Sequence, residues 1–165
     1  MIRTRLLATA FILNSGDLLL IQRSRDAKLL PGMWAPVGGH IEADELETPQ
    51  VACEREVSEE TGLSGSDIRD LSLRYIVHRI RHNEIRIQFI YVGSSAKRDL
   101  GSTDEGELHW VPLAVAPSLD VSATTRFTIE HFVKTGSRTT ALYVGSVSGQ
   151  EGNPVINWSV LSDWE

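Results

Sequence analysis

Three glutamates in the segment 38–63, which reads GGHIEADELETPQVACEREVSEETGL, have a spacing that suits metal binding. Glu56, Glu59 and Glu60 stand three and four residues apart, so a helix would place them on one face. Carboxylates on one face repel each other unless a cation lies among them. Hard divalent metals such as Mg²⁺ take oxygen ligands and bind with the help of substrate phosphates. The alternative is a solvated acidic face, and the surrounding residues argue against it.

The residues around the glutamates predict a helix over about 49–61. Thr48 can cap the helix N-terminus, Pro49 is favoured at the first helical position, and Gly62 supplies a stop. Cys53 is expected to be a small buried residue of this helix, with a reactive thiol as the alternative. Because the chain has one cysteine, an intramolecular disulfide is excluded.

The segment resembles the signature of the Nudix hydrolases, G-x5-E-x7-R-E-U-x-E-E-x-G-U, in which U is an aliphatic residue. The second half of the signature matches position for position, through Arg55, Glu56, Val57, Glu59, Glu60, Gly62 and Leu63. The first half departs from it. Glu47 stands eight residues before Arg55, as x7 requires, but seven residues separate Glu47 from Gly39 where the signature has five.

Two extra residues therefore lie between Gly39 and the helix. Aligning Glu45 instead of Glu47 restores the first spacing of the signature and spoils the second. Loops absorb insertions more readily than helices do. We therefore place the extra residues in the loop, at Ala43 and Asp44, and align Glu47 with the signature.

The resemblance implies both a fold and an activity. Nudix proteins are α/β proteins that form an α/β/α sandwich with a mixed β-sheet. They hydrolyse a phosphoanhydride of a nucleoside diphosphate that is linked to another group. The charge of such a substrate resists attack by water, and Mg²⁺, or Mn²⁺ in its place, lowers this repulsion. We therefore expect a Mg²⁺-dependent pyrophosphohydrolase.

The resemblance also assigns roles to residues of the segment. The metal ligands that it implies are the Gly39 carbonyl oxygen, Glu56, Glu59 and Glu60. One carboxylate, Glu56 or Glu59, would accept a proton from the attacking water. Arg55 would hold a neighbouring glutamate by a forked hydrogen bond, and Glu47 would complete this supporting set.

A further acidic ligand often comes from a distant loop in this family. Asp104, Glu105 and Glu107 lie just ahead of a predicted strand that carries Trp110. Several family members have a similar E-G-x-L-x-W-V stretch at this place. We expect Glu105 to contribute to the metal site, with a solvated loop residue as the alternative.

Four residues outside the segment are candidates for substrate binding, namely Arg23, Trp34, Arg79 and Arg86. The arginines could contact phosphates. Family members often have an aromatic residue near Trp34 that lines the base pocket, although a core tryptophan would satisfy the pattern equally well. Some members that remove oxidised purine nucleotides have Asn directly after this position. This chain has Ala35 there, which argues against an oxidised-guanine specificity.

The leading expectation is hydrolysis of a nucleoside triphosphate or a related nucleoside diphosphate derivative. The runner-up is an ADP-ribose or sugar-nucleotide hydrolase. A non-catalytic Nudix module that senses a nucleotide belongs to a different class, but such modules usually lose acidic residues that are present here. An isoprenoid diphosphate isomerase would need its own catalytic cysteine, whereas Cys53 lies on the signature helix.

The composition is that of one small globular domain over residues 1–165. Hydrophobic residues make up 41% of the chain and charged residues 23%. The net charge of −6 argues against binding to polymeric nucleic acid or to a membrane surface, because both favour a basic patch. The chain has no apolar run of membrane-spanning length and its N-terminus does not resemble a signal peptide, so a cytoplasmic location is expected.

The hydrophobic pattern along the rest of the chain predicts a mixed α/β order. Alternation and turn residues indicate strands over 6–13, 18–22, 34–37, 71–80, 85–92 and 108–111. A second helix is expected over 124–134, closed by Gly136. Residues 141–165 are expected to form a C-terminal hairpin extension. This hairpin would either add to the sheet edge or cover a partner subunit in a homodimer.

Overall fold

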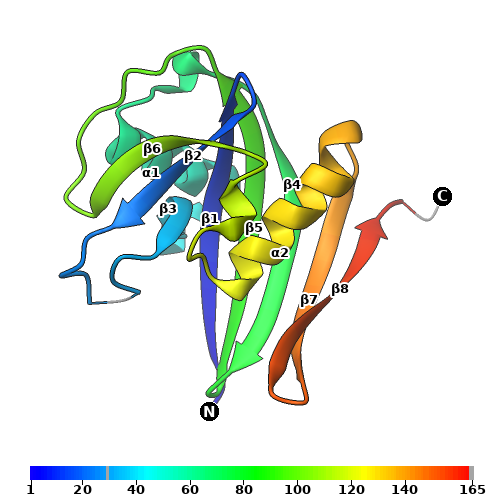
Figure 1. The fold of residues 1–165 in the computed structure, drawn as a ribbon. Coiled ribbons are helices and arrows are strands. Elements are labelled where there is room, and N and C mark those ends of the chain that lie inside the picture. The colour runs from blue at the N-terminus through cyan, green and yellow to red at the C-terminus, as the bar shows by residue number, and fades with distance from the viewer. Residues whose placement is uncertain (29, 164–165) are drawn as a thin grey trace.

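The computed structural model describes residues 1–28 and 30–163. Its centre is a mixed eight-stranded β-sheet in the order β6-β2-β3-β1-β5-β4-β7-β8 (Figure 1). The strands are β1 (Arg3–Asn14), β2 (Asp17–Arg23), β3 (Trp34–His40), β4 (Ile68–Arg81), β5 (Glu84–Ser95), β6 (Gly106–Pro112), β7 (Leu142–Gln150) and β8 (Asn153–Leu161). The pairs β1–β5 and β4–β7 are parallel, and the remaining neighbours are antiparallel.

Two helices, α1 (Pro49–Thr61) and α2 (Ala123–Lys134), cover opposite faces of this sheet. Side chains alternate between the two faces along a strand. Phe11 of β1 therefore packs into the core beneath α2, together with Ile129 of that helix. The next residue, Ile12, packs into the core beneath α1. This layering confirms the predicted α/β/α sandwich with a mixed sheet.

Helix α1 begins and ends where the sequence predicts. Thr48 occupies the N-cap position, although its side chain forms no capping hydrogen bond. Pro49 stands in the first turn, and Gly62 follows the last turn with a φ of +71°. Glycine adopts this left-handed conformation at little steric cost, and its N–H donates to the carbonyl of Ser58 at 2.9 Å. Cys53 is completely buried beneath the helix, as expected for a core residue. Its burial raises the pKa of the thiol to about 12, which disfavours the reactive thiolate.

The C-terminal hairpin of β7 and β8 extends the sheet beyond β4, which is one of the two predicted arrangements. Trp158 of β8 packs against the rings of Tyr75 and His131, at centroid distances of 5.4 and 4.6 Å. Gly145 of β7 leaves room for this indole, because a Cβ there would overlap it. The hairpin is thus attached both to β4 and to α2. No helix in the described residues is long and apolar enough to cross a membrane.

Candidate functional site

The end of β3 brings backbone against the carboxylates of α1. Gly38 has a φ of +139°, which L side chains rarely adopt, and a Cβ there would overlap the backbone of β1. A Cβ on Gly39 would overlap the carboxylate of Glu56. The Gly38 N–H donates to Oε2 of Glu60 at 2.8 Å. The double glycine therefore lets the chain lie directly against two of the three glutamates.

Glu60 carries its carboxylate in surroundings that disfavour a negative charge. The residue is only 6% exposed. Burial is the main cause that raises the pKa of Glu60 to about 8, and the negative charges of Glu105 and Glu56 act in the same direction. The hydrogen bond from Gly38 and the positive charge of Arg23 oppose this rise. A cation beside these carboxylates would favour the ionised form of Glu60.

The loop that leads into β6 brings Glu105 toward this cluster. Of the three acidic candidates in that region, Glu105 is the one whose charge acts on the pKa of Glu60. Its Oε2 accepts a hydrogen bond of 3.4 Å from Nη1 of Arg23, at the end of β2. Asp104 and Glu107 line an adjoining polar cavity of about 530 Å³, which Arg23 also lines.

Arg55 organises the acidic residues through four hydrogen bonds to carboxylates. Its Nε donates to Oε1 of Glu45 at 2.8 Å, and its Nη2 donates to Oε2 of Glu45 at 2.9 Å. Its Nη1 donates to Glu56 at 2.8 Å and to Glu59 at 3.3 Å. One guanidinium therefore joins the loop before α1 to two carboxylates on the helix.

The structure corrects the alignment of the first half of the signature. The expectation that Glu47 supports Arg55 is wrong, because Glu45 forms both bonds of the fork and Glu47 is solvent-exposed. Ala43, Asp44 and Glu45 form a short 3-10 turn in which the Glu42 N–H donates to Glu45 at 2.9 Å. The spacing from Gly39 to Glu45 thus obeys the signature, and the two extra residues lie after Glu45.

Glu59 differs from its two neighbours in exposure. Its side chain is 61% exposed, whereas that of Glu56 is 15% exposed. Within residues 1–28 and 30–163, no group of three or more His, Cys, Asp or Glu side chains is already gathered at metal-binding separations. The chemistry of the donors nevertheless fits a hard cation, because Gly39, Glu56, Glu60 and Glu105 all offer oxygen. Burial is the main cause of the raised pKa of Glu60, and the charges of Glu105 and Glu56 add to it, so a cation bound beside these carboxylates would lower this pKa.

Arg79 and Arg86 lie apart from the glutamates, in a cavity of about 560 Å³ on the α2 face of the sheet. Gln88 also lines this cavity, and its Nε2 donates to Oγ1 of Thr9 at 2.7 Å. Thr9 is the cross-strand partner of Gly38. The hydrogen bond between Gln88 and Thr9 therefore connects the cavity to the strand position opposite Gly38.

Trp34 has a structural position at the start of β3. Its partly buried ring packs against the core beneath α2, and the ring centroid lies 5.1 Å from that of His109. The backbone N–H of Trp34 donates to the carbonyl of Asp120 at 2.8 Å. It is not among the residues that line the arginine cavity. This placement fits the core alternative for Trp34 as well as a role near the site.

The sequence patterns led to Glu47 in place of Glu45, and they did not single out Arg81 or Gln88. Glu45 could have been found by giving the short G-x5-E spacing priority, because it connects Gly39 to the arginine across a tight turn. Arg81 and Gln88 line the cavity as Arg79 and Arg86 do. Their alternation along β4 and β5 was visible, but the partner elements that enclose the cavity come from distant parts of the chain.

Comparison with known proteins agrees with the signature and the fold. A family model described as NUDIX domain matches residues 3–132. The matched region covers α1, the acidic cluster and all but the last two residues of α2, and it ends before the C-terminal hairpin.

Solved structures of several Nudix proteins superpose on this chain at low sequence identity. A MutT protein from Bacillus halodurans is 17% identical with a TM-score of 0.72, covering 94% of this chain and 97% of its own. A MutT protein from Methanosarcina mazei Go1 is 24% identical with a TM-score of 0.70, covering 82% and 96%. The E. coli dihydroneopterin triphosphate pyrophosphohydrolase is 23% identical with a TM-score of 0.60, covering 81% and 99%. At these identities the superpositions establish the fold alone.

Proposed function

This chain belongs to the Nudix family of hydrolases, and we propose that it is a Mg²⁺-dependent pyrophosphohydrolase of small nucleotides. Its substrate is a nucleoside triphosphate or a related nucleoside diphosphate derivative, and the bond that it cuts is a phosphoanhydride. The observation that carries the proposal is the placement of Glu56 and Glu60 against the Gly38–Gly39 backbone. Buried carboxylates without a cation are costly, so this arrangement suits a protein that binds metal there.

The residues that would hold the metal are Glu56, Glu60 and the Gly39 carbonyl, with Glu59 and Glu105 at the rim. Mg²⁺ held there would neutralise phosphate charge and would lower the pKa of the attacking water. Glu56 or Glu59 would accept a proton from the attacking water. Arg55 donates to Glu56 at 2.8 Å and to Glu59 at 3.3 Å, and the side chain of Glu59 is far more exposed than that of Glu56.

Two alternative functions are compatible with this fold. Hydrolysis of ADP-ribose or a sugar nucleotide needs the same acidic cluster and differs in the group that leaves, which the arginine cavity could select. A non-catalytic sensing module would not need a carboxylate network held by four hydrogen bonds from Arg55. That network favours an enzyme.

An assay of hydrolysis across a nucleotide panel tests the proposal. The panel should contain nucleoside triphosphates, ADP-ribose and sugar nucleotides, with pyrophosphate, phosphate and nucleoside monophosphate measured as products in the presence of Mg²⁺. We expect turnover that is abolished by a chelator and restored by Mg²⁺ or Mn²⁺. Tight nucleotide binding without any turnover would support a sensing module instead.

A further inference from the structure

A row of arginines crosses three neighbouring strands on the α2 face of the sheet. Arg5 of β1 is the cross-strand partner of Arg86 of β5, and Arg86 is the partner of Arg79 of β4. Directly opposed residues have Cβ atoms about 5 Å apart, and like charges at that separation destabilise a sheet. The row ends at Val147 of β7. The fold therefore tolerates a set of adjacent positive charges that its own stability does not favour.

Little in the protein neutralises this row. Two arginines of the row form ion pairs, and both pairs are with Glu84. A carboxylate oxygen of Glu84 lies 3.3 Å from Nε of Arg5, and the other lies 3.1 Å from Nη2 of Arg86. Among the described residues, Arg79 forms no hydrogen bond or ion pair, and Nε of Arg86 is buried without a partner. Burial and the neighbouring guanidinium of Arg86 lower the pKa of Arg79. Unused donors in partly desolvated surroundings indicate that an anion completes the row.

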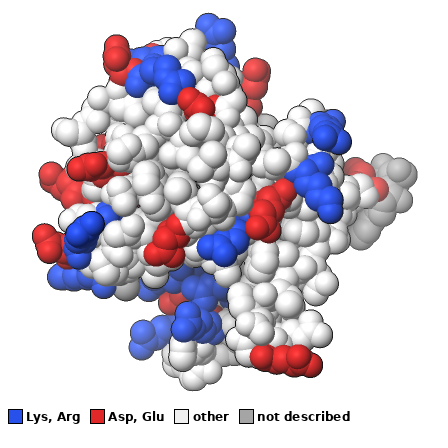
Figure 2. Space-filling model, in the orientation of Figure 1, with Lys and Arg blue, Asp and Glu red and all other residues white. Residues whose placement is uncertain are grey.

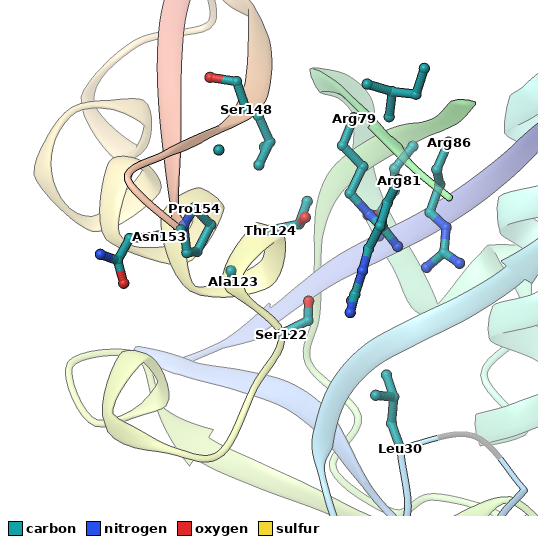
Figure 3. A pocket seen from close by; sticks show the side chains of 15 residues that line it. Leu30, Arg79, Arg81, Arg86, Ser122, Ala123, Thr124, Ser148, Asn153 and Pro154 are labelled. Atoms are coloured by element: carbon teal, nitrogen blue, oxygen red, sulfur yellow. The ribbon is translucent and has the colours of Figure 1, made fainter. Parts of the chain in front are cut away.

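Arg79 and Arg86 of the row line one wall of the cavity of about 560 Å³ (Figure 3). Arg79, Arg81 and Arg86 project from β4 and β5, and the tip of the β7–β8 hairpin lies across from them with Ser148 and Asn153. The first residues of α2 close a further side, and the N-terminus of that helix adds a positive potential. In the space-filling view, Lys and Arg side chains gather at the lower end of the molecule, although the whole chain is acidic (Figure 2).

A series of contacts links the cavity to the Gly38 backbone, which Glu60 contacts. Gln88 contacts Thr9 from the cavity side, Thr9 pairs with Gly38, and the Gly38 N–H donates to Glu60. Strands β5 and β3 are separated by β1, so Gln88 and Gly38 lie on the order of 10 Å apart across the sheet, at the strand spacing of 4.7–4.9 Å. This separation corresponds to about one nucleoside.

We propose that the arginine row binds a second phosphate of the substrate, a phosphate monoester remote from the phosphoanhydride that is cut. The inference rests on the proposed function and narrows its substrate class to nucleoside diphosphate derivatives with an additional phosphate. Guanidinium forks suit such a group because they donate two parallel hydrogen bonds to phosphate oxygens. The β7–β8 hairpin, which lies beyond the residues that match the family model, supplies the facing wall and thereby contributes to specificity.

Thermal unfolding with inorganic phosphate tests the pocket independently of catalysis. A chelator is included so that metal at the glutamates cannot contribute, and sodium chloride of equal ionic strength is the reference. Phosphate stabilises many proteins by exclusion from their surface, so the variants Arg79→Gln and Arg86→Gln are compared with Arg69→Gln, an exposed arginine on the same strand as Arg79. We expect the specific rise in Tm in wild type and Arg69→Gln, and its loss in both pocket variants. An equal rise in all four proteins would overturn the proposal.

A substrate pair tests the same pocket during turnover. ADP-ribose and its 2′-phosphorylated counterpart differ only in the additional phosphate. We expect wild type to favour the phosphorylated compound in kcat/KM, and Arg79→Gln to lower this preference by about tenfold, as loss of a charged hydrogen bond implies. Arg69→Gln should keep the preference.

The possible failures of the two proposals can be told apart. Equal kcat/KM values for the two compounds in wild type would overturn the second phosphate site and leave the pyrophosphohydrolase standing. If no nucleotide of the panel is hydrolysed, the proposed function fails, and the phosphate titration alone then decides whether the arginine row is an anion site.

Discussion

Arg55 and Glu45 form a two-pronged ion pair, with Nε to Oε1 at 2.8 Å and Nη2 to Oε2 at 2.9 Å. The hydrogen bonds from Arg55, with one from the Glu42 N–H, hold the pKa of Glu45 at about 2. Because these two nitrogens are occupied by Glu45, the remaining Nη1 is directed to Glu56 and Glu59. Glu45 therefore determines the orientation of the Arg55 guanidinium relative to Glu56 and Glu59.

Glu45→Gln should reduce activity even though Glu45 is not expected to touch substrate. The amide cannot accept two charged hydrogen bonds, so Arg55 would lose its orientation and Glu56 its fixed partner. Residues that orient the groups around a metal commonly contribute 10–100-fold to affinity or activity, and we expect a loss of about that size in kcat/KM. Glu47→Gln is the matched control and should behave as wild type, since Glu47 is exposed. Equal losses in both variants would refute the assignment of Glu45.

The two extra residues of the signature can be located by paired deletions. Removing Leu46 and Glu47, both exposed, restores the spacing between Glu45 and Arg55 that the signature has. We expect this deletion to preserve the fold and much of the activity. Removing Ala43 and Asp44 instead destroys the 3-10 turn that carries Glu45, so activity should fall sharply. Circular dichroism and turnover of the two variants provide the comparison, and the opposite ranking would contradict the observed register.

The stability of the metal-free protein should fall as pH rises from about 4.5 to about 8. Glu60 has a folded-state pKa of about 8, above the ordinary glutamate pKa of about 4.5. In this window the folded state retains a proton that the unfolded state has released, so each step upward in pH favours unfolding. Melting curves in a chelator should show this slope in wild type and a flatter one in Glu60→Gln. Saturating Mg²⁺ should raise Tm most at the alkaline end, where the carboxylate is needed in its charged form. A pH profile identical in wild type and Glu60→Gln would rule out this origin of the slope.

Replacing a candidate base should separate catalysis from folding. Glu59→Gln keeps the shape of the side chain and removes its charge, and Glu56→Gln does the same at a more buried position. We expect the variant that lacks the base to lose about 10²–10⁴ in kcat. Glu59→Gln should leave metal-free stability unchanged or slightly higher, because it removes repulsion among carboxylates on one helix face. Wild-type turnover in both variants would contradict a catalytic role for these carboxylates. The acidic face would then be a binding site or a solvated surface.

The sequence by itself determined the elements whose signals are local. The cap residues and glycine stop of α1 lie within a few residues of the helix, and its three glutamates share a face by helical geometry alone. Alternation and turn residues predicted the strands for the same reason. The signature then supplied the family, because its second half lies on a single uninterrupted helix whose spacing cannot vary.

The tertiary structure decided what depends on contacts between distant segments. The choice between Glu45 and Glu47 required knowing how the loop folds back on Arg55, since a loop can absorb two residues on either side of a contact. The arginine row depends on strand register, which places Arg5 beside Arg86 although they are far apart in sequence. The cavity in front of that row is completed by the C-terminal hairpin and by the start of α2. Local patterns specify faces and ends of elements, whereas the packing of those elements specifies which faces meet.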